Sequence, residues 1–588
     1  MKNILNIIGL TSLLVLTSSC EDFLERTPKT SITAVDYFKT ASDLETYTNR
    51  FYQTFLKIDM TNGGGGAPFN DRGSDNLTMY TNGTTNMYTM IDNDGLTPSN
   101  VGGWNKDDWA RLRLVNYMLD NIHPSQMNIA EVDLNHYVGI ARYFRGDYYY
   151  KKVKDYSAVP FYNTALDDND PGIYKASDSR ELVVDSVISD LEFAAKYIKP
   201  ALGQRTALNR YAALTLLARV CLYEATYRKY HTELGLAATA NTFLDKAIAA
   251  CEEIMNAGLF QIHGSSAEGY SELFCSEKLR DNKEIILFME CDATLGIGNN
   301  AHSVLGMYSG LTRSLMEAYQ MKDGSDYSPT HPDGSYKTFV EVFQDRDPRM
   351  SEVFAYPGFN QSPDIEGYAD YKVELNYGGF DQLKFYPRLT SQRKGWNMNY
   401  TSLPIFRYAE VLLIYAEAKA EKGTLTQADL DQSVNLIRNR VGMPAIVQSG
   451  NVLEDIRRER RVELACEGFR MDDIKRWALG RELLGVRPQG MYIHGYGAFD
   501  TTGDGVPDIA LLPNEDDESS IANLPEDVRA KLTKRYVSSG QFTLSEGDHG
   551  YMEFVRSKNR KWEDKYYYIP IPKAQMDLNP NLIQSPGW

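Results

Sequence analysis

The chain has 588 residues, of which 43% are hydrophobic and 24% charged, so it is long enough for several domains or for one large body with a sizeable core. Both shares are those of an ordinary globular protein, which excludes a chain that is disordered, collagen-like or coiled-coil throughout. The net charge of -17 would repel a phosphate backbone, so we expect no nucleic-acid partner.

The amino-terminal residues have the pattern of a secretory signal peptide. Lys2 precedes an apolar run over 4–16, and the small residues of 17–19 follow. Cys20 comes next, where a lipoprotein signal peptidase would cut and leave a lipid-modified cysteine. We therefore predict a signal peptide over 1–19 and lipidation of Cys20. An ordinary secretory signal followed by an incidental cysteine is the alternative.

A long polar loop separates two predicted helices. The helices are expected over Asp36–Leu56 and Asp108–Ile122, and the loop between them, 61–104, is rich in Gly, Asn, Asp and Thr. Loops of this length are uncommon in compact proteins and often carry function. The 61–104 loop is therefore the first candidate binding surface.

Two pairs of predicted helices resemble each other. Apolar residues recur at helical spacing over Ala207–Ala225 and over Leu403–Ala420, where Gly423 ends the pattern. A second helix follows each of them, over Leu244–Ala257 and Ala428–Val441. These pairs look like tetratricopeptide units, although a clean repeat of about 34 residues is absent. Unrelated antiparallel helices are the alternative.

The segments between and after the helix pairs are irregular. Short runs that favour strands, such as Glu284–Met289, alternate with glycine-rich turns. The predicted fold class is mainly α, with a tetratricopeptide-like helix-pair scaffold and an irregular loop-rich lobe that contains short β-strands. The scaffold is assigned to about 30–60, 105–261, 401–482 and 552–588, and the lobe to about 61–104, 262–400 and 485–551, all within one domain over 20–588.

Motifs for catalysis or for structural metals are absent from the sequence. Five scattered cysteines follow Cys20 without a CxxC pair, which indicates neither a disulfide framework nor a zinc site. The patterns GxSxG, HExxH, GxxxxGK[ST] and GxGxxG do not occur. We therefore expect no enzyme, although two carboxylates could still pair in space without a local motif.

Several segments carry a family resemblance. They are ARYFRGD at 141–147, FRYAEVLLIYAEA at 406–418, IRRERRVELACEGFR at 456–470 and IPIP at 569–572. In this order they resemble the SusD-like (RagB/SusD) nutrient-binding lipoproteins of bacterial outer membranes, over nearly the whole mature chain. The charges of 454–470 are interpreted as structural, because residues such as Glu454 and Arg458 could pair along a helix.

The resemblance implies a function and a location. It implies a cell-surface protein, lipid-anchored to the outer membrane and facing the exterior, that binds a nutrient, often an oligosaccharide. It also implies a TonB-dependent (SusC-like) transporter as the partner that receives the ligand. Binding of a peptide or another non-sugar nutrient, or a helical-repeat interaction scaffold without a nutrient, are the alternatives.

The family places its ligand site in variable loops, and no residue motif carries over. A sugar is recognised by an aromatic face and by polar side chains that meet its hydroxyls. The candidates in the 61–104 loop are Phe69, Asn70, Asp71, Arg72, Asp75, Tyr80, Tyr88 and Trp104, with Trp104 the first choice. Further candidates in 296–309 and 396–400 are Asn299, Asn300, Tyr308 and Trp396.

One loop resembles a calcium-binding loop. Asp500, Thr502, Asp504 and Asp508 place oxygen atoms at the spacing of the DxDxDGxxD pattern, around glycines that permit a tight turn. Thr502 replaces one acidic ligand. A structural calcium ion is therefore expected as an option, a solvated turn is the alternative, and no other cofactor is expected.

Overall fold

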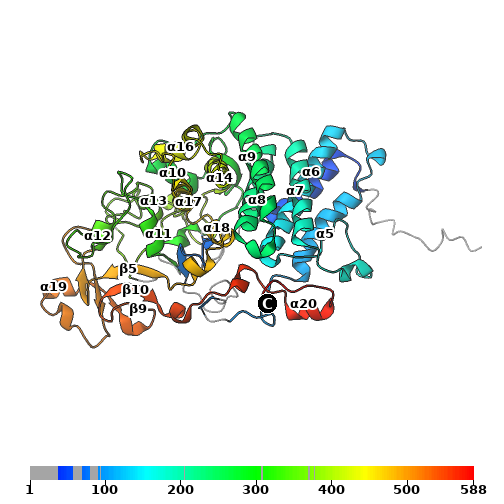
Figure 1. Ribbon diagram of the computed structural model, residues 1–588. Coiled ribbons are helices and arrows are strands. Elements are labelled where there is room, and N and C mark those ends of the chain that lie inside the picture. The colour runs from blue at the N-terminus through cyan, green and yellow to red at the C-terminus, as the bar shows by residue number, and fades with distance from the viewer. Residues whose placement is uncertain are drawn as a thin grey trace, which may run out of the picture.

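Helices gather in one half of the molecule, and short strands joined by long loops occupy much of the other half (Figure 1). The computed structural model describes residues 37–56, 69–79, 91–92, 95–203, 205–305, 309–368, 371–375 and 378–588. The predicted fold class is confirmed, because packed helix pairs form the scaffold and the strands are short. In this described part, no helix has the length and hydrophobicity needed to cross a membrane.

The scaffold is an array in which successive helices pack against one another. Contacts join α6 to α7, α7 to α8, α8 to α9 and α9 to α14. The last contact adds to the array a helix that follows only after the whole 262–400 segment. The members are α3 (Ala41–Phe55), α5 (Lys106–Asp120), α6 (Glu131–Tyr156), α7 (Arg180–Tyr197), α8 (Arg210–Tyr230), α9 (Ala240–Asn256) and α14 (Tyr408–Lys422).

Local sequence signals set the ends of these helices. Thr40 and Asp43 form a capping box at the start of α3, in which each side chain accepts a hydrogen bond from the other residue's backbone. Asn209 caps α8 by accepting from the backbone of Ala212 at 3.0 Å. Gly423 ends α14 at a φ of 76°, a left-handed conformation that favours glycine. The predicted end at Gly423 is confirmed.

Two glycines let α6 and α7 approach closely. A Cβ atom at Gly146 would lie 3.0 Å from the side chain of Leu191, and one at Gly139 would lie 3.0 Å from that of Ile198. Gly146 belongs to the 141–147 segment that carries part of the family resemblance. Its role there is to make room for the neighbouring helix.

The predicted helix over Leu403–Ala420 is wrong in its first residues. They form strand β4 (Leu403–Arg407), which pairs antiparallel with β2 (Ile285–Met289), and α14 begins only at Tyr408. Pro404 has no backbone N–H to donate, and the β-prone residues Ile405 and Phe406 follow it. Pairing with β2 therefore overrides the helical spacing.

The predicted helix over Ala428–Val441 is divided in two. It consists of α15 (Gln427–Asp431) and α16 (Val434–Arg440), with Ser433 between them. The Ser433 hydroxyl donates to the carbonyl of Asp429, the group that a continuous helix would bond to the backbone N–H of residue 433. This local competition breaks the helix.

The lobe contains three small sheets, and β2 with β4 forms a fourth. The strands are β1 (Leu77–Met79) with β3 (Ser309–Leu311), β5 (Gln489–Ile493) with β10 (Gly550–Phe554) and β9 (Phe542–Leu544), and β6 (Gly497–Phe499) with β7 (Ile509–Leu512) and β8 (Thr533–Tyr536). The pair β7–β8 is parallel and the others are antiparallel. The remaining helices are α10 (Ala267–Cys275), α11 (Arg313–Ala318), α12 (Phe339–Val342), α13 (Met350–Val353), α17 (Val452–Glu463), α18 (Arg470–Arg476), α19 (Glu526–Arg529) and α20 (Lys573–Leu578).

Two large hydrophobic cores lie side by side, and β4 and α17 contribute to both. Phe406 and Ile456 belong to the core of the helical array, whereas Leu403 and Val462 belong to the core of the lobe. The five cysteines of the described chain are buried and free. The two elements that reach both cores therefore connect scaffold and lobe.

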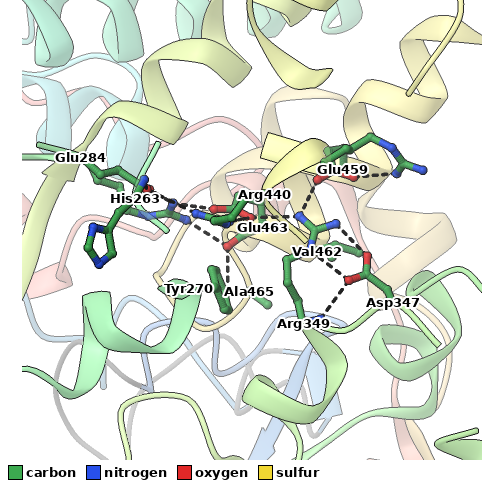
Figure 2. Close-up of polar contacts among 12 residues, drawn as sticks. His263, Tyr270, Glu284, Asp347, Arg349, Arg440, Glu459, Val462, Glu463 and Ala465 are labelled. Carbon is green, nitrogen blue, oxygen red and sulfur yellow. Dashed lines mark hydrogen bonds and ion pairs between the residues drawn. The ribbon is translucent and has the colours of Figure 1, made fainter. Parts of the chain in front are cut away.

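A buried network of charges marks this connection. Figure 2 shows Glu463, fully buried at the end of α17, between arginines of other segments. Its carboxylate accepts hydrogen bonds from Arg440 at 2.6 Å, Arg407 at 2.6 Å and Arg349 at 2.9 Å. Burial opposes ionisation, but these three guanidinium groups outweigh it and hold the pKa of Glu463 well below its ordinary value.

The predicted pairing of charges along 454–470 is only partly correct. The exposed pairs, such as Arg458 with Asp455, do lie within α17, although Glu454 pairs with Arg457. The buried acidic residues instead pair across elements, since Glu459 bonds Arg349 at 2.5 Å and Arg438 at 2.9 Å. The segment is structural, as interpreted, but it joins elements to one another.

Candidate ligand-binding site

A cavity of about 380 Å³ opens in the lobe. Its walls include His302, Tyr371, Lys372, Asp381, Tyr386 and Arg393. This volume is within the range of pockets that hold small organic ligands. The walls combine aromatic rings with donors and acceptors, which suits a ligand rich in hydroxyl groups.

Two segments that the sequence proposes separately meet beside this cavity. The backbones of Asn299 and Asn399 exchange hydrogen bonds of 2.8 and 3.2 Å. The Asn300 amide also donates to the Asn397 side chain at 2.6 Å. A Cβ atom at Gly298 would lie 2.2 Å from the Asn397 carbonyl oxygen, so only glycine fits there. The 296–309 and 396–400 segments therefore hold each other in place.

Trp396 extends from this junction. It follows the cavity residue Gly395 and meets His302 edge to face, with 5.6 Å between the ring centroids. The Trp396 side chain is 43% exposed. A large aromatic ring that is exposed beside a cavity offers a stacking face to a ligand.

His302 has one nitrogen fixed by a neighbour. Its Nδ1 lies 2.8 Å from the Asn399 amide nitrogen. Burial lowers the pKa of His302, although the hydrogen bond to Asn399 opposes the shift. His302 is therefore neutral at pH 7, and Nδ1 accepts from Asn399, which leaves the proton on Nε2.

Arg393 is anchored by uncharged groups. Its Nε donates to the Pro387 carbonyl at 3.1 Å, and its Nη2 donates to the Ser362 hydroxyl at 2.6 Å and to the Gln361 carbonyl. The guanidinium carbon lies 5.1 Å from the centroid of the Tyr386 ring. These contacts fix the plane of the guanidinium group at the cavity wall.

Asp381 contributes a buried carboxyl group to the cavity. It is 3% exposed and accepts a hydrogen bond from the Tyr371 hydroxyl. Burial raises the pKa of Asp381 to about 7. This group therefore titrates near neutral pH, so the cavity loses negative charge when the pH falls below 7.

Comparison with known proteins identifies the family. A sequence model of the SusD family matches residues 252–588, more than half of the chain. The chain belongs to the SusD family. SusD-like proteins P2 and P38 of Formosa agariphila are 24% identical over 512 residues and 25% identical over 515 residues. Each alignment covers 82% of this chain, with 91% of P2 and 93% of P38.

Solved structures share the fold of this SusD family member. A SusD-like carbohydrate binding protein of Bacteroides fragilis superposes with a TM-score of 0.69 at 22% identity, covering 92% of this chain and 99% of the other. A laminarin binding SusD-like protein gives a TM-score of 0.56 at 17% identity, covering 94% and 100%. At such identities the likeness establishes the fold alone.

Trp104, the first choice of the sequence, lies in the core of the helical array. It is 6% exposed and meets Trp109 and Tyr156 edge to face, with centroid distances of 5.1 and 4.9 Å. The Lys152 ammonium lies 5.2 Å from its ring centroid. In this SusD family member, packing against α6 therefore leaves Trp104 without the exposed face that the prediction requires.

The acidic candidates of the 61–104 loop hold backbone and arginine groups. The Asp71 carboxylate accepts from the backbone N–H groups of Cys466 and Gly468, at 2.7 and 3.1 Å. Asp75 pairs with Arg470 at 2.7 Å and with Arg461 at 2.9 Å. Burial opposes ionisation of Asp75, but the two arginines outweigh it and lower its pKa to about 2. Both aspartates link the loop to 461–470.

The other loop candidates are scattered. Phe69 is buried in the core of the lobe, Arg72 is half-buried, and Asn70 is exposed and lines a different cavity of about 300 Å³. Tyr80, Tyr88 and Tyr308 lie outside the described residues, so predictions for them stay predictions.

The loop proposed for calcium has its carboxylates engaged by protein groups. Asp500 accepts from backbone N–H groups, including those of Gly503 at 2.7 Å and Gly505 at 2.8 Å. Asp508 accepts from the Thr501 backbone at 3.0 Å. Asp504 accepts from a backbone N–H within the loop, and Thr502 is half-buried. No cluster of metal-binding side chains is found in the described residues, and calcium binding stays a prediction.

Sequence reasoning did not single out the polar groups of the cavity. Arg393 precedes Trp396 by three residues, so the aromatic candidate was a signal to its neighbour. Asp381 and Tyr371 gave no such signal, because their proximity to His302 arises only through folding.

Proposed function

We propose that this protein binds a glycan in the cavity beside Trp396 and does not transform it. The observation that carries the proposal is the exposed Trp396 ring, held edge to face against His302 next to a cavity with polar walls. An aromatic face can stack on the C–H surface of a sugar while donors and acceptors in the cavity bond its hydroxyls.

Similar structures support a carbohydrate as the ligand. They include proteins described as carbohydrate binding, laminarin binding and surface glycan-binding. The absence of catalytic motifs from the sequence supports binding without reaction. Which glycan binds depends on the chemistry of the cavity, which differs from loop to loop between relatives.

We also propose a place for the protein at the cell surface. Cys20 would carry the lipid anchor in the outer membrane, and a TonB-dependent transporter would receive the ligand. The signal-like residues 1–19 and the family membership support this arrangement. More than one acyl chain would be needed for stable attachment.

Calorimetric titration with an oligosaccharide panel tests the glycan site. The full-length mature protein with Cys20→Ser is compared with the same protein carrying Trp396→Ala. We expect at least a tenfold loss of affinity, about 1.4 kcal/mol, for the glycan that binds. Tyr174→Ala, which removes a ring that is 52% exposed on the scaffold, is the control and should leave the affinity unchanged. Unchanged affinity in the Trp396 variant, or binding of peptides alone, would contradict the proposal.

A further inference from the structure

Arg393 carries a positive charge that no carboxylate of the described chain neutralises. Its printed acceptors are the carbonyl oxygens of Pro387 and Gln361 and the hydroxyl of Ser362. Its Nη1 has no protein acceptor among the described residues. An arginine in a partly desolvated site gains most from an anion, because charge-assisted hydrogen bonds to guanidinium are strong and can be bidentate.

The other ionisable side chains of the cavity are compensated or weakly charged. Lys372 pairs with Asp508 at 2.9 Å, and Glu374 pairs with Arg535 at 3.1 Å. The Asp381 carboxyl group receives the Tyr371 hydroxyl, and its pKa of about 7 means that it is only partly ionised at neutral pH. The uncompensated charge of the cavity is therefore positive, at Arg393.

The position of Arg393 is suited to recognition. Stacking on Tyr386 and two carbonyl contacts fix the guanidinium plane before any ligand arrives, which reduces the entropy lost on binding. Arg393 is also three residues from Trp396, on the same 390–400 segment. A sugar stacked on Trp396 could thus present a substituent to Arg393.

We propose that the ligand of this cavity is an acidic glycan, and that Arg393 binds its carboxylate or sulfate group. This inference rests on the proposed glycan-binding function and adds the chemical class of the ligand. The chain as a whole carries a net charge of -17, so its overall field does not attract anions. Selectivity for an acidic glycan therefore needs a local cation such as Arg393.

The test uses matched acidic and neutral glycans. Calorimetry compares tetragalacturonate with its methyl ester, and a sulfated carrageenan tetrasaccharide with its desulfated form. The full-length mature protein with Cys20→Ser is the reference, with Arg393→Gln, Arg393→Lys and Lys394→Gln made in it. Lys394→Gln is the matched control, because Lys394 is exposed, adjacent in sequence and removes the same charge.

We expect at least one acidic probe to bind tenfold or more tightly than its neutral partner. Arg393→Gln should abolish this ratio, Arg393→Lys should retain part of it, and Lys394→Gln should leave it unchanged. The carboxylate and sulfate pairs show which anion is preferred. Circular dichroism and thermal denaturation confirm that each variant is folded.

Equal affinity for acidic and neutral forms, an acid preference that survives Arg393→Gln, or no binding of either acidic probe would overturn the inference. The glycan-binding proposal can stand in that case, if a neutral glycan binds and is lost in Trp396→Ala. Conversely, an acid preference that depends on Arg393 but not on Trp396 would support the anion site and reject the stacking role.

Discussion

Trp396 and His302 come from segments far apart in the sequence and meet at an angle of 86° between their rings. The contact depends on the asparagines beneath it, because Asn399 fixes the His302 ring and Asn300 fixes the backbone of the 396–400 segment. The candidate site is therefore assembled by side-chain amides, which define how the exposed indole is presented.

Gly298 should be essential for this presentation. Gly298→Ala places a Cβ atom 2.2 Å from the Asn397 carbonyl oxygen, so the two segments must separate. We expect a loss of about 1–3 kcal/mol in stability and a clear loss of glycan affinity, measured by urea denaturation and calorimetry. Gly203→Ala is the control, since a Cβ there meets nothing within 4 Å. Equal behaviour of the two variants would refute this role.

Trp104 and Trp396 should separate stability from binding. Trp104→Ala removes a buried ring from the core of the helical array and should cost about 3–5 kcal/mol. Trp396→Ala removes an exposed ring and should change stability by no more than about 0.5 kcal/mol. Urea denaturation of both variants checks this. A large destabilisation by Trp396→Ala would show that its ring is a packing residue.

Asp381 should make stability depend on pH. Its pKa rises to about 7 on folding, so the folded state binds the proton more tightly than the unfolded state does. The stability contributed by protonation is present at acidic pH and is lost as the pH rises through 7. Asp381→Asn should remove up to about 4 kcal/mol of this dependence. The difference between wild type and variant is measured by urea denaturation from pH 5 to 8, with the exposed Asp185→Asn as control.

Glu463 should be far more important for stability than the exposed acids of α17. Glu463→Gln leaves three buried arginines without their shared carboxylate, which should cost about 3–5 kcal/mol. Glu454→Gln removes an exposed partner of Arg457 and should cost less than about 1 kcal/mol. Chemical denaturation compares the two. A mild effect of Glu463→Gln would mean that water replaces the lost carboxylate.

The helices could be predicted from sequence because apolar spacing and caps are local, as with Gly423 at the end of α14. The site could be predicted only in part. Trp104 and Trp396 both stand among polar loop residues, and packing on Tyr156 of α6 is what buries the first. Asp71 likewise looks solvated in sequence, but its partners at 466–470 are almost four hundred positions away.

The shared carboxylate of Glu463 also has a consequence for how the molecule comes apart. Arg349 belongs to the lobe, and Arg407 ends the strand that reaches both cores. If the lobe unfolded alone, Glu463 and its arginines would lose partners inside a still-folded interior. Scaffold and lobe are thus expected to melt as one cooperative unit, so the shape of the cavity is guaranteed by the stability of the whole chain.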